Sequence, residues 1–83
     1  MNRTVLITGA ALRIGRVIAE TLARRDWDVI VHAHRSAAEA DALCAQLRAL
    51  GRQAWRVGGD LLVPAGADGV FDAALDAAGH VDA

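Results

Sequence analysis

The sequence predicts an α/β fold with a doubly wound parallel sheet, of which its 83 residues form the N-terminal half. Apolar runs of strand length alternate three times with stretches of helical periodicity, in the order βαβαβα. The first strand is apolar at consecutive positions, as in a sheet covered on both faces. Two glycines, Gly9 and Gly15, mark the passage from this strand to the first helix. These observations together indicate a Rossmann-type sheet with right-handed crossovers.

The first strand is expected at residues 4–8 and the first helix at about 13–25. Apolar residues recur in this helix at spacings of three and four, so we expect them to form its buried face. They are Ile14, Val17, Ile18, Thr21 and Leu22. The charged residues that follow, Asp28 among them, are expected to be solvated.

The second strand is expected at about 28–34, and the third at about 53–57. Between them, Ser36 and Glu39 form a capping box that starts the second helix, and Gly51 ends it. The expected buried residues of this helix are Ala40, Leu43, Cys44, Leu47 and Leu50. A third helix, with Pro64 in its first turn and Gly79 at its end, should precede a fourth strand at Val81.

The composition excludes several classes of protein. Hydrophobic residues make up 54% of the chain, too many for a disordered protein. A net charge of -1 gives no electrostatic basis for binding nucleic acid or an anionic membrane. No apolar run has the length of a membrane span, and the N-terminus lacks the pattern of a secretory signal. The single cysteine, Cys44, fits a reducing compartment. We therefore expect a cytoplasmic protein.

Gly9 and Gly15 predict a phosphate-binding loop. Gly9 lets the chain turn tightly after the strand, and Gly15 lets helix and strand pack closely. The free N–H groups at the start of the helix then face an anion. Arg13 is expected to project toward the ligand, where it can contact a pyrophosphate or an anionic substrate. A plain structural turn with a solvated arginine is the alternative.

The end of the second strand predicts which dinucleotide binds. Domains that prefer NAD usually place Asp or Glu there, about 20 residues beyond the glycine loop, to hold the ribose hydroxyls. Residues 32–36 read His-Ala-His-Arg-Ser and contain no acid. The guanidinium of Arg35, the hydroxyl of Ser36 and the N-terminus of the second helix suit a dianionic 2′-phosphate. We therefore predict NADPH as the cofactor, although Ser36 alternatively serves only as a helix cap.

Polar residues near the ends of the second and third strands complete the predicted site. Asp60 is expected to accept a hydrogen bond from the adenine amino group while Leu61 packs on the ring, unless Asp60 only caps a turn. His32 and His34 share a strand face, but no third ligand accompanies them, so we predict no metal site. His34 is expected to line the adenosine pocket, and His32 to be an ordinary strand residue.

Groups that carry catalysis are missing from the sequence. It contains no tyrosine and no lysine, and its only serine is Ser36. No nucleophile or acid–base pair stands beside a partner. We therefore expect these residues to bind a cofactor without turning over a substrate.

The segment Thr8-Gly9-Ala10-Ala11-Leu12-Arg13-Ile14-Gly15-Arg16 resembles the N-terminal cofactor motif of the short-chain dehydrogenase/reductase family. Arg13 in place of the usual central glycine, together with residues 34–40, resembles the pteridine reductase branch of that family. Residues 60–61 and 79–82 also match the family's order. The resemblance extends over the whole chain, but only over the first third of a typical member.

The resemblance implies NADPH-dependent hydride transfer to a small substrate such as a pterin or dihydrofolate. It assigns the phosphates to Gly9, Arg13, Ile14 and Gly15, the 2′-phosphate to His34, Arg35 and Ser36, and adenine to Asp60 and Leu61. The family's Asn-Asn-Ala motif, catalytic serine and Tyr-x-x-x-Lys pair lie beyond the position of Asp82. We therefore expect residues 1–83 to be the dinucleotide-binding part of a single domain, truncated before its catalytic segment. Intact members of the family are commonly homo-oligomers.

Two other interpretations stay open from the sequence. One is a non-catalytic half-domain that binds a nucleotide, and the other is a structural piece that pairs edge to edge. The first strand would then present an apolar open edge, because its neighbour in such sheets is the fourth strand. A methyltransferase-type nucleotide fold is disfavoured, since it usually has an acid where Arg35 stands.

Overall fold

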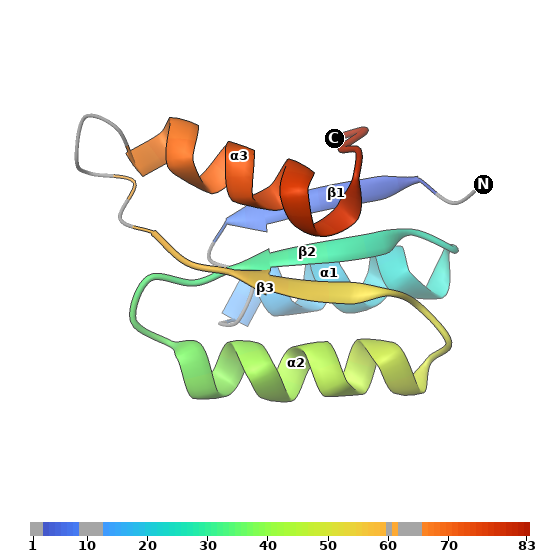
Figure 1. Cartoon of the computed structure of the whole chain (residues 1–83). Helices are drawn as coiled ribbons and strands as arrows, with labels where there is room; N and C mark the ends of the chain where they lie inside the picture. Colours follow the sequence, from blue (N-terminus) through green and yellow to red (C-terminus); the bar gives the residue numbers. More distant parts are fainter. Residues whose placement is uncertain (1–2, 9–12, 60, 62–65) are drawn as a thin grey trace.

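A computed structural model describes residues 3–8, 13–59, 61 and 66–83 (Figure 1). Within them the expected alternation of strands and helices is confirmed, with boundaries that differ from the expected ones by at most two residues. The elements are β1 (Thr4–Thr8), α1 (Arg13–Arg24), β2 (Asp28–His32), α2 (Ala37–Ala49), β3 (Ala54–Val57) and α3 (Gly66–Ala78). The predicted position of Pro64 lies outside the described residues.

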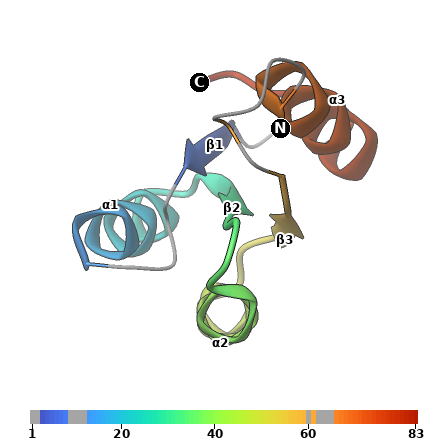
Figure 2. The same ribbon diagram turned by 90° about the vertical axis from the view of Figure 1, so that its left-hand side faces the viewer.

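The three strands form a parallel sheet in the order β1-β2-β3. Helices α1 and α2 cover one face of the sheet, and α3 covers the other, as the view along the strands in Figure 2 shows. Thr8 lies in register with His32, and His32 with Val57, so all three strands end along one edge of the sheet. This is the doubly wound architecture that the sequence predicts.

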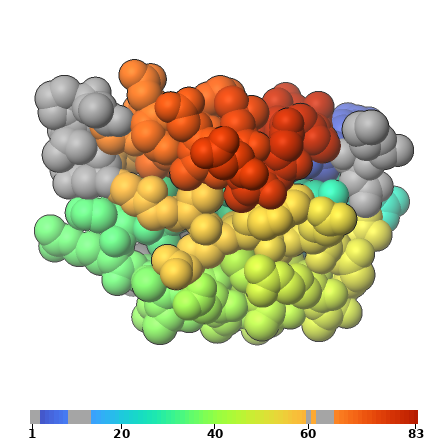
Figure 3. Space-filling view, in the orientation of Figure 1, coloured from blue at the N-terminus to red at the C-terminus, as the bar shows by residue number. Residues whose placement is uncertain are grey.

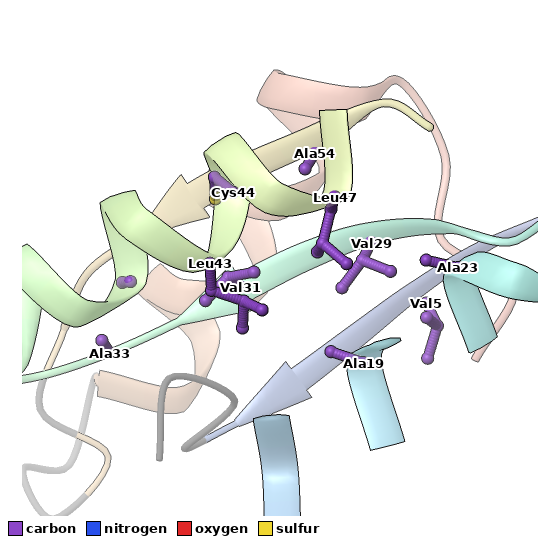
Figure 4. Packing of buried hydrophobic residues seen from close by; sticks show 11 residues of the cluster. Val5, Ala19, Ala23, Val29, Val31, Ala33, Leu43, Cys44, Leu47 and Ala54 are labelled. Carbon is purple, nitrogen blue, oxygen red and sulfur yellow. The ribbon is translucent and has the colours of Figure 1, made fainter. Parts of the chain in front are cut away.

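The larger core lies between the sheet and helix α2 (Figure 4). Val29 and Val31 of β2 face Leu43 and Leu47 of α2, and all four side chains are completely buried. Burying one such side chain stabilises the fold by roughly 1.5–3 kcal/mol. The apolar face predicted for α2 is therefore confirmed, except that Leu50, at the end of the helix, is exposed.

Helix α1 contradicts the predicted pattern. Its residues Ala19 and Ala23 are buried in the core, and of the predicted stripe only Leu22 packs against that core. Three other apolar side chains of the stripe, Ile14, Val17 and Ile18, are 76%, 61% and 45% exposed. Small side chains allow a helix to lie close to the sheet that it covers. The close packing of Ala19 and Ala23 therefore determines which face of α1 turns toward the sheet.

A smaller core lies under α3. Ile30 of β2 and Val57 of β3 pack there against Val70 and Ala74, all of them buried. Because Ile30 stands between Val29 and Val31 in a strand, its side chain points to the opposite face of the sheet. Val70 and Ala74 of α3 are thus buried, whereas Phe71, which shares their helical periodicity, is 47% exposed.

Helices α1 and α2 end in the same backbone arrangement. After α2, Gly51 has φ +86°, its N–H donates to the carbonyl of Arg48 at 2.9 Å, and the N–H of Arg52 donates to that of Leu47 at 3.2 Å. This is a Schellman motif with glycine in the left-handed position, as predicted. The corresponding residue after α1 is Asp26, with φ +70°.

The last residues of the chain lie beside β1, on the edge opposite β2. The N–H of Asp82 donates to the carbonyl of Thr4 at 2.8 Å, and the N–H of Leu6 donates to that of Ala83 at 2.8 Å. The Asp82 carboxylate also accepts a hydrogen bond from the N–H of Thr4 at 2.8 Å. These parallel contacts agree with the expectation that a further strand begins near Val81.

At the amino ends of the strands, the prediction that Asp28 is solvated is wrong. Asp28 is buried, and its carboxylate accepts a hydrogen bond from the N–H of Gln53 at 3.0 Å. Its own N–H donates to the carbonyl of Arg3 at 2.8 Å. Asp28 therefore connects the start of β2 by hydrogen bonds to Arg3, which precedes β1, and to Gln53, which precedes β3.

In the described part of the chain, β3 ends the sheet on the side away from β1, and it forms the band between α3 and α2 in Figure 3. The carbonyl of Gln53 accepts a hydrogen bond from Val29 of β2 at 3.1 Å, so the next carbonyl, that of Ala54, points outward. Arg48 of α2 donates from Nη2 to this outward carbonyl at 2.7 Å.

Candidate functional site

The candidate site lies along the sheet edge where the three strands end. In open parallel sheets, ligands bind outside the carboxyl ends of the strands. Thr8, His32 and Val57 occupy this edge in register, and the chain leaves each of them toward a helix. The predicted site residues follow these three ends directly.

The connection from β2 to α2 brings three of the predicted residues together. The N–H of Ala33 donates to the carbonyl of Val57 at 3.1 Å, which extends the pairing by one residue beyond β2. His34 and Arg35 then form an exposed bend, and Ser36 is half-buried at the head of α2. Among the described residues, no carboxylate pairs with the guanidinium of Arg35.

Ser36 is the N-cap of α2, as predicted, and its carbonyl accepts the first helical hydrogen bond from Ala40 at 2.9 Å. The capping box itself is not formed, because the Ser36 side chain makes no capping hydrogen bond. Its backbone angles, φ -102° and ψ 49°, lie outside the extended region that N-caps usually occupy. The amide groups at the start of α2 lack helical partners, so this end of the helix can donate hydrogen bonds to an anion.

The loop between β1 and α1 is described only at its two ends. Gly9 lies outside the described residues, and so does the side chain of Arg13, the first residue of α1. Ile14 is strongly exposed, and Gly15 is half-buried in the first turn of the helix. The strand-before and helix-after context that the glycine motif requires is therefore present.

The connection after β3 holds the predicted adenine residues. Asp60 lies outside the described residues, and Leu61 is 40% exposed. Gly59, just before them, has φ +139°, and a Cβ atom on it would lie 2.7 Å from Cγ2 of Val70 in α3. Neither the backbone angle nor the space there accommodates a side chain.

Sequence reasoning missed His32, expected to be an ordinary strand residue. His32 is only 4% exposed, and its Nε2 lies 2.8 Å from the carbonyl oxygen of Gly59. The bond joins the end of β2 to the loop after β3. The available signal was a polar residue directly after the apolar run of residues 29–31 in this strand.

The described ranges contain no candidate metal site, and their cysteine belongs to the core. No three His, Cys, Asp or Glu side chains there gather into a group that could hold a metal ion. Burial raises the pKa of the Cys44 thiol, so this side chain stays protonated at neutral pH and packs in the core as an apolar group. None of the helices in these ranges is long and apolar enough to cross a membrane.

Comparison with known proteins identifies the family. A model of the short chain dehydrogenases matches residues 3–83. The chain belongs to this family. A tetrahydroxynaphthalene reductase from Pestalotiopsis fici is 35% identical over 81 residues, which are 98% of this chain and 29% of that protein. Pteridine reductase 1 from Leishmania tarentolae is 52% identical over 44 residues, which are 53% of this chain and 15% of that protein.

Solved structures of short chain dehydrogenases share the fold closely. An acetoin dehydrogenase from Enterobacter cloacae superposes with a TM-score of 0.91 at 28% identity, over 98% of this chain and 33% of its own. A short chain dehydrogenase from Burkholderia cenocepacia, in complex with NADP, gives 0.88 at 34% identity over the same shares. The chain spans about a third or less of the length of these relatives.

Proposed function

We propose that this chain is the NADPH-binding portion of a short-chain oxidoreductase that transfers hydride from NADPH to a small substrate. The arrangement of Arg35 and Ser36 at the head of α2 carries the proposal. These residues stand where NAD-preferring domains usually have a carboxylate. A guanidinium that pairs with no carboxylate of the described residues, next to a helix N-terminus, is chemically matched to a doubly charged phosphate.

The remaining contacts follow the same edge of the sheet. Gly9, Arg13, Ile14 and Gly15 would hold the phosphates between β1 and α1, and His34 would add to the 2′-phosphate site. Asp60 and Leu61 would receive the adenine. The exposed side chain of Leu61 supports this role, because a flat apolar ring can cover it. The NADP complex of the Burkholderia cenocepacia relative supports the choice of cofactor.

A pterin or dihydrofolate is the proposed class of substrate. The 52% identity over 44 residues to a pteridine reductase supports it, as do Arg13 and the His34–Ser36 segment. Tyrosine and lysine are absent from the chain, so the proton donor and its partner would come from a catalytic segment that follows these residues in the same domain. We further propose that the intact protein is a cytoplasmic homo-oligomer.

The charge of Arg35 offers a direct test of cofactor choice. In the natural protein that contains this chain, Arg35→Asp should weaken NADPH binding by about 10- to 100-fold, because a charge-assisted contact becomes a repulsive one. NADH affinity should change by less than about twofold, since NADH lacks the 2′-phosphate. Titration calorimetry with each dinucleotide measures both. Arg25→Asp, the same change at an exposed arginine beyond the end of α1, is the matched control.

Equal losses for NADPH and NADH in Arg35→Asp would refute the 2′-phosphate role. A separate assay tests the substrate class. NADPH oxidation should be faster with a dihydropterin or dihydrofolate than with a 3-oxoacyl thioester. The reverse order would assign the protein to another branch of the family.

A further inference from the structure

We propose that His32 is a positioning residue for the adenosine half of the cofactor. Its imidazole donates a hydrogen bond to the carbonyl of Gly59, a contact that we call the brace, and thereby fixes the backbone at Gly59, two residues before Leu61. This inference rests on the proposed function, because it concerns the same nucleotide. It adds to the proposed site a buried residue at the end of β2.

The hydrogen bond between His32 and Gly59 defines which nitrogen of the imidazole carries the proton. Nε2 of His32 lies 2.8 Å from the carbonyl oxygen of Gly59, and a carbonyl can only accept a hydrogen bond. Nε2 therefore carries a proton and donates it. Nδ1 of the same ring is buried and has no hydrogen-bond partner in the described part of the chain. Among the described residues, the hydrogen bond to Gly59 is therefore the polar contact that orients this buried ring.

Gly59 is held from a second side. A Cβ on Gly59 would lie 2.7 Å from Cγ2 of Val70, so its backbone is pressed against α3. Its φ of +139° is a conformation that other residues rarely adopt. His32 from β2 and Val70 from α3 therefore clamp one residue between them, and the direction in which the chain leaves Gly59 is set by both.

The clamp acts at the position where the nucleotide should meet the loop. Leu61 lies two residues beyond Gly59 and is exposed. A loop fixed before the ligand arrives loses less conformational entropy on binding, which raises affinity without adding a contact. His32 should therefore affect the adenosine half of the nucleotide and not the nicotinamide half.

Substitutions of His32 separate this role from a packing role. His32→Leu removes the donor and keeps the side chain apolar, whereas the amide nitrogen of His32→Gln can replace Nε2. We expect His32→Leu to weaken both NADPH and adenosine 2′,5′-bisphosphate by about tenfold, and His32→Gln to stay within about threefold of wild type. Titration calorimetry of the natural protein measures each affinity. Ile30→Ala is the matched control. Ile30 is buried on the same face of β2, but its apolar side chain cannot donate a hydrogen bond to the Gly59 carbonyl.

Circular dichroism verifies that each variant is folded at the titration temperature. If His32→Leu does not fold, His32→Asn takes its place, since its shorter side chain is polar but cannot reach the carbonyl. Nitrogen-15 spectra of the wild type provide an independent readout, and they should show the Nε2–H tautomer of His32. An Nδ1–H tautomer would overturn the brace.

The remaining outcomes distinguish this inference from the function on which it rests. If wild type prefers NADPH but His32→Leu binds as wild type does, or His32→Gln binds as weakly as His32→Leu, only the positioning role is overturned. Losses of the same size in Ile30→Ala would also overturn it, because they would reflect destabilisation alone. If wild type binds no dinucleotide, the proposed function and the positioning role both fail.

Discussion

Helices α1 and α2 cover the same face of the sheet, and each ends in the same left-handed turn, yet they use their apolar residues in opposite ways. Helix α2 buries Leu43 and Leu47 completely, while α1 buries two alanines and leaves Ile14, Val17 and Ile18 exposed. An apolar stripe in a sequence thus reveals that a helix has an apolar face. It does not reveal that this face meets the sheet, because small residues on another face can allow the closer approach.

The largest effect is expected from truncation of the α2 face. Leu47→Ala should lower the free energy of unfolding by about 2–5 kcal/mol, because it leaves a cavity at a fully buried position. Urea denaturation of the natural protein, followed by the fluorescence of its tryptophans, measures the loss. Leu50→Ala, the same change at the exposed end of this face, is the matched control and should cost much less. Equal losses at both positions would contradict the burial of α2.

The two helix ends should respond in opposite directions. Gly51→Ala should destabilise the protein by about 1 kcal/mol, through its backbone angle alone, because a Cβ at Gly51 meets no atom within 4 Å. Asp26→Gly should stabilise it by up to about 1 kcal/mol, since glycine adopts the same left-handed conformation without strain. The same denaturation curves give both values.

Asp26→Asn controls for the ion pair between Asp26 and Arg52. That pair spans 3.7 Å and Asp26 is 85% exposed, so its contribution is small. Asparagine tolerates the left-handed conformation and removes the charge. If Asp26→Asn lost as much stability as Gly51→Ala, the ion pair, and not the backbone, would dominate the end of α1.

The smallest effect is expected on the exposed face of α1. Val17→Ala should change the free energy of unfolding by no more than about 0.5 kcal/mol, because the Val17 side chain is largely solvated and alanine favours the helix. Val29→Ala, at a fully buried position in β2, supplies the contrast. A loss at Val17 as large as that at Leu47 would show that another surface covers this face of α1.

Local patterns in the sequence were sufficient for the order and boundaries of the elements. The N-cap at Ser36 and the left-handed Gly51 were located because each depends on residues within one or two turns of the helix. The buried face of α1 and the burial of Asp28 were not predicted correctly. Both depend on contacts between elements distant in the sequence, such as the hydrogen bond from Gln53 to Asp28.

The candidate site was predictable where chain order alone places residues at the carboxyl edge of the sheet. His34, Arg35 and Ser36 do lie together there, after β2. The contact between His32 and Gly59 was not predictable, because it joins residues 27 positions apart across two strands. Its strength depends on burial, which a single sequence position does not reveal.

The hydrogen bond from Arg48 to the outward carbonyl of Ala54 has a consequence for encounters between molecules. An outer strand with free carbonyl and amide groups is a template on which a strand of another molecule can add. Strand β3 has only four residues, and an incoming strand would first have to displace the Arg48 guanidinium from the carbonyl of one of them, Ala54. It would also meet the positive charge of Arg48 as it approached. The contact between Arg48 and Ala54 thus makes the addition of a foreign strand at this position of β3 less favourable.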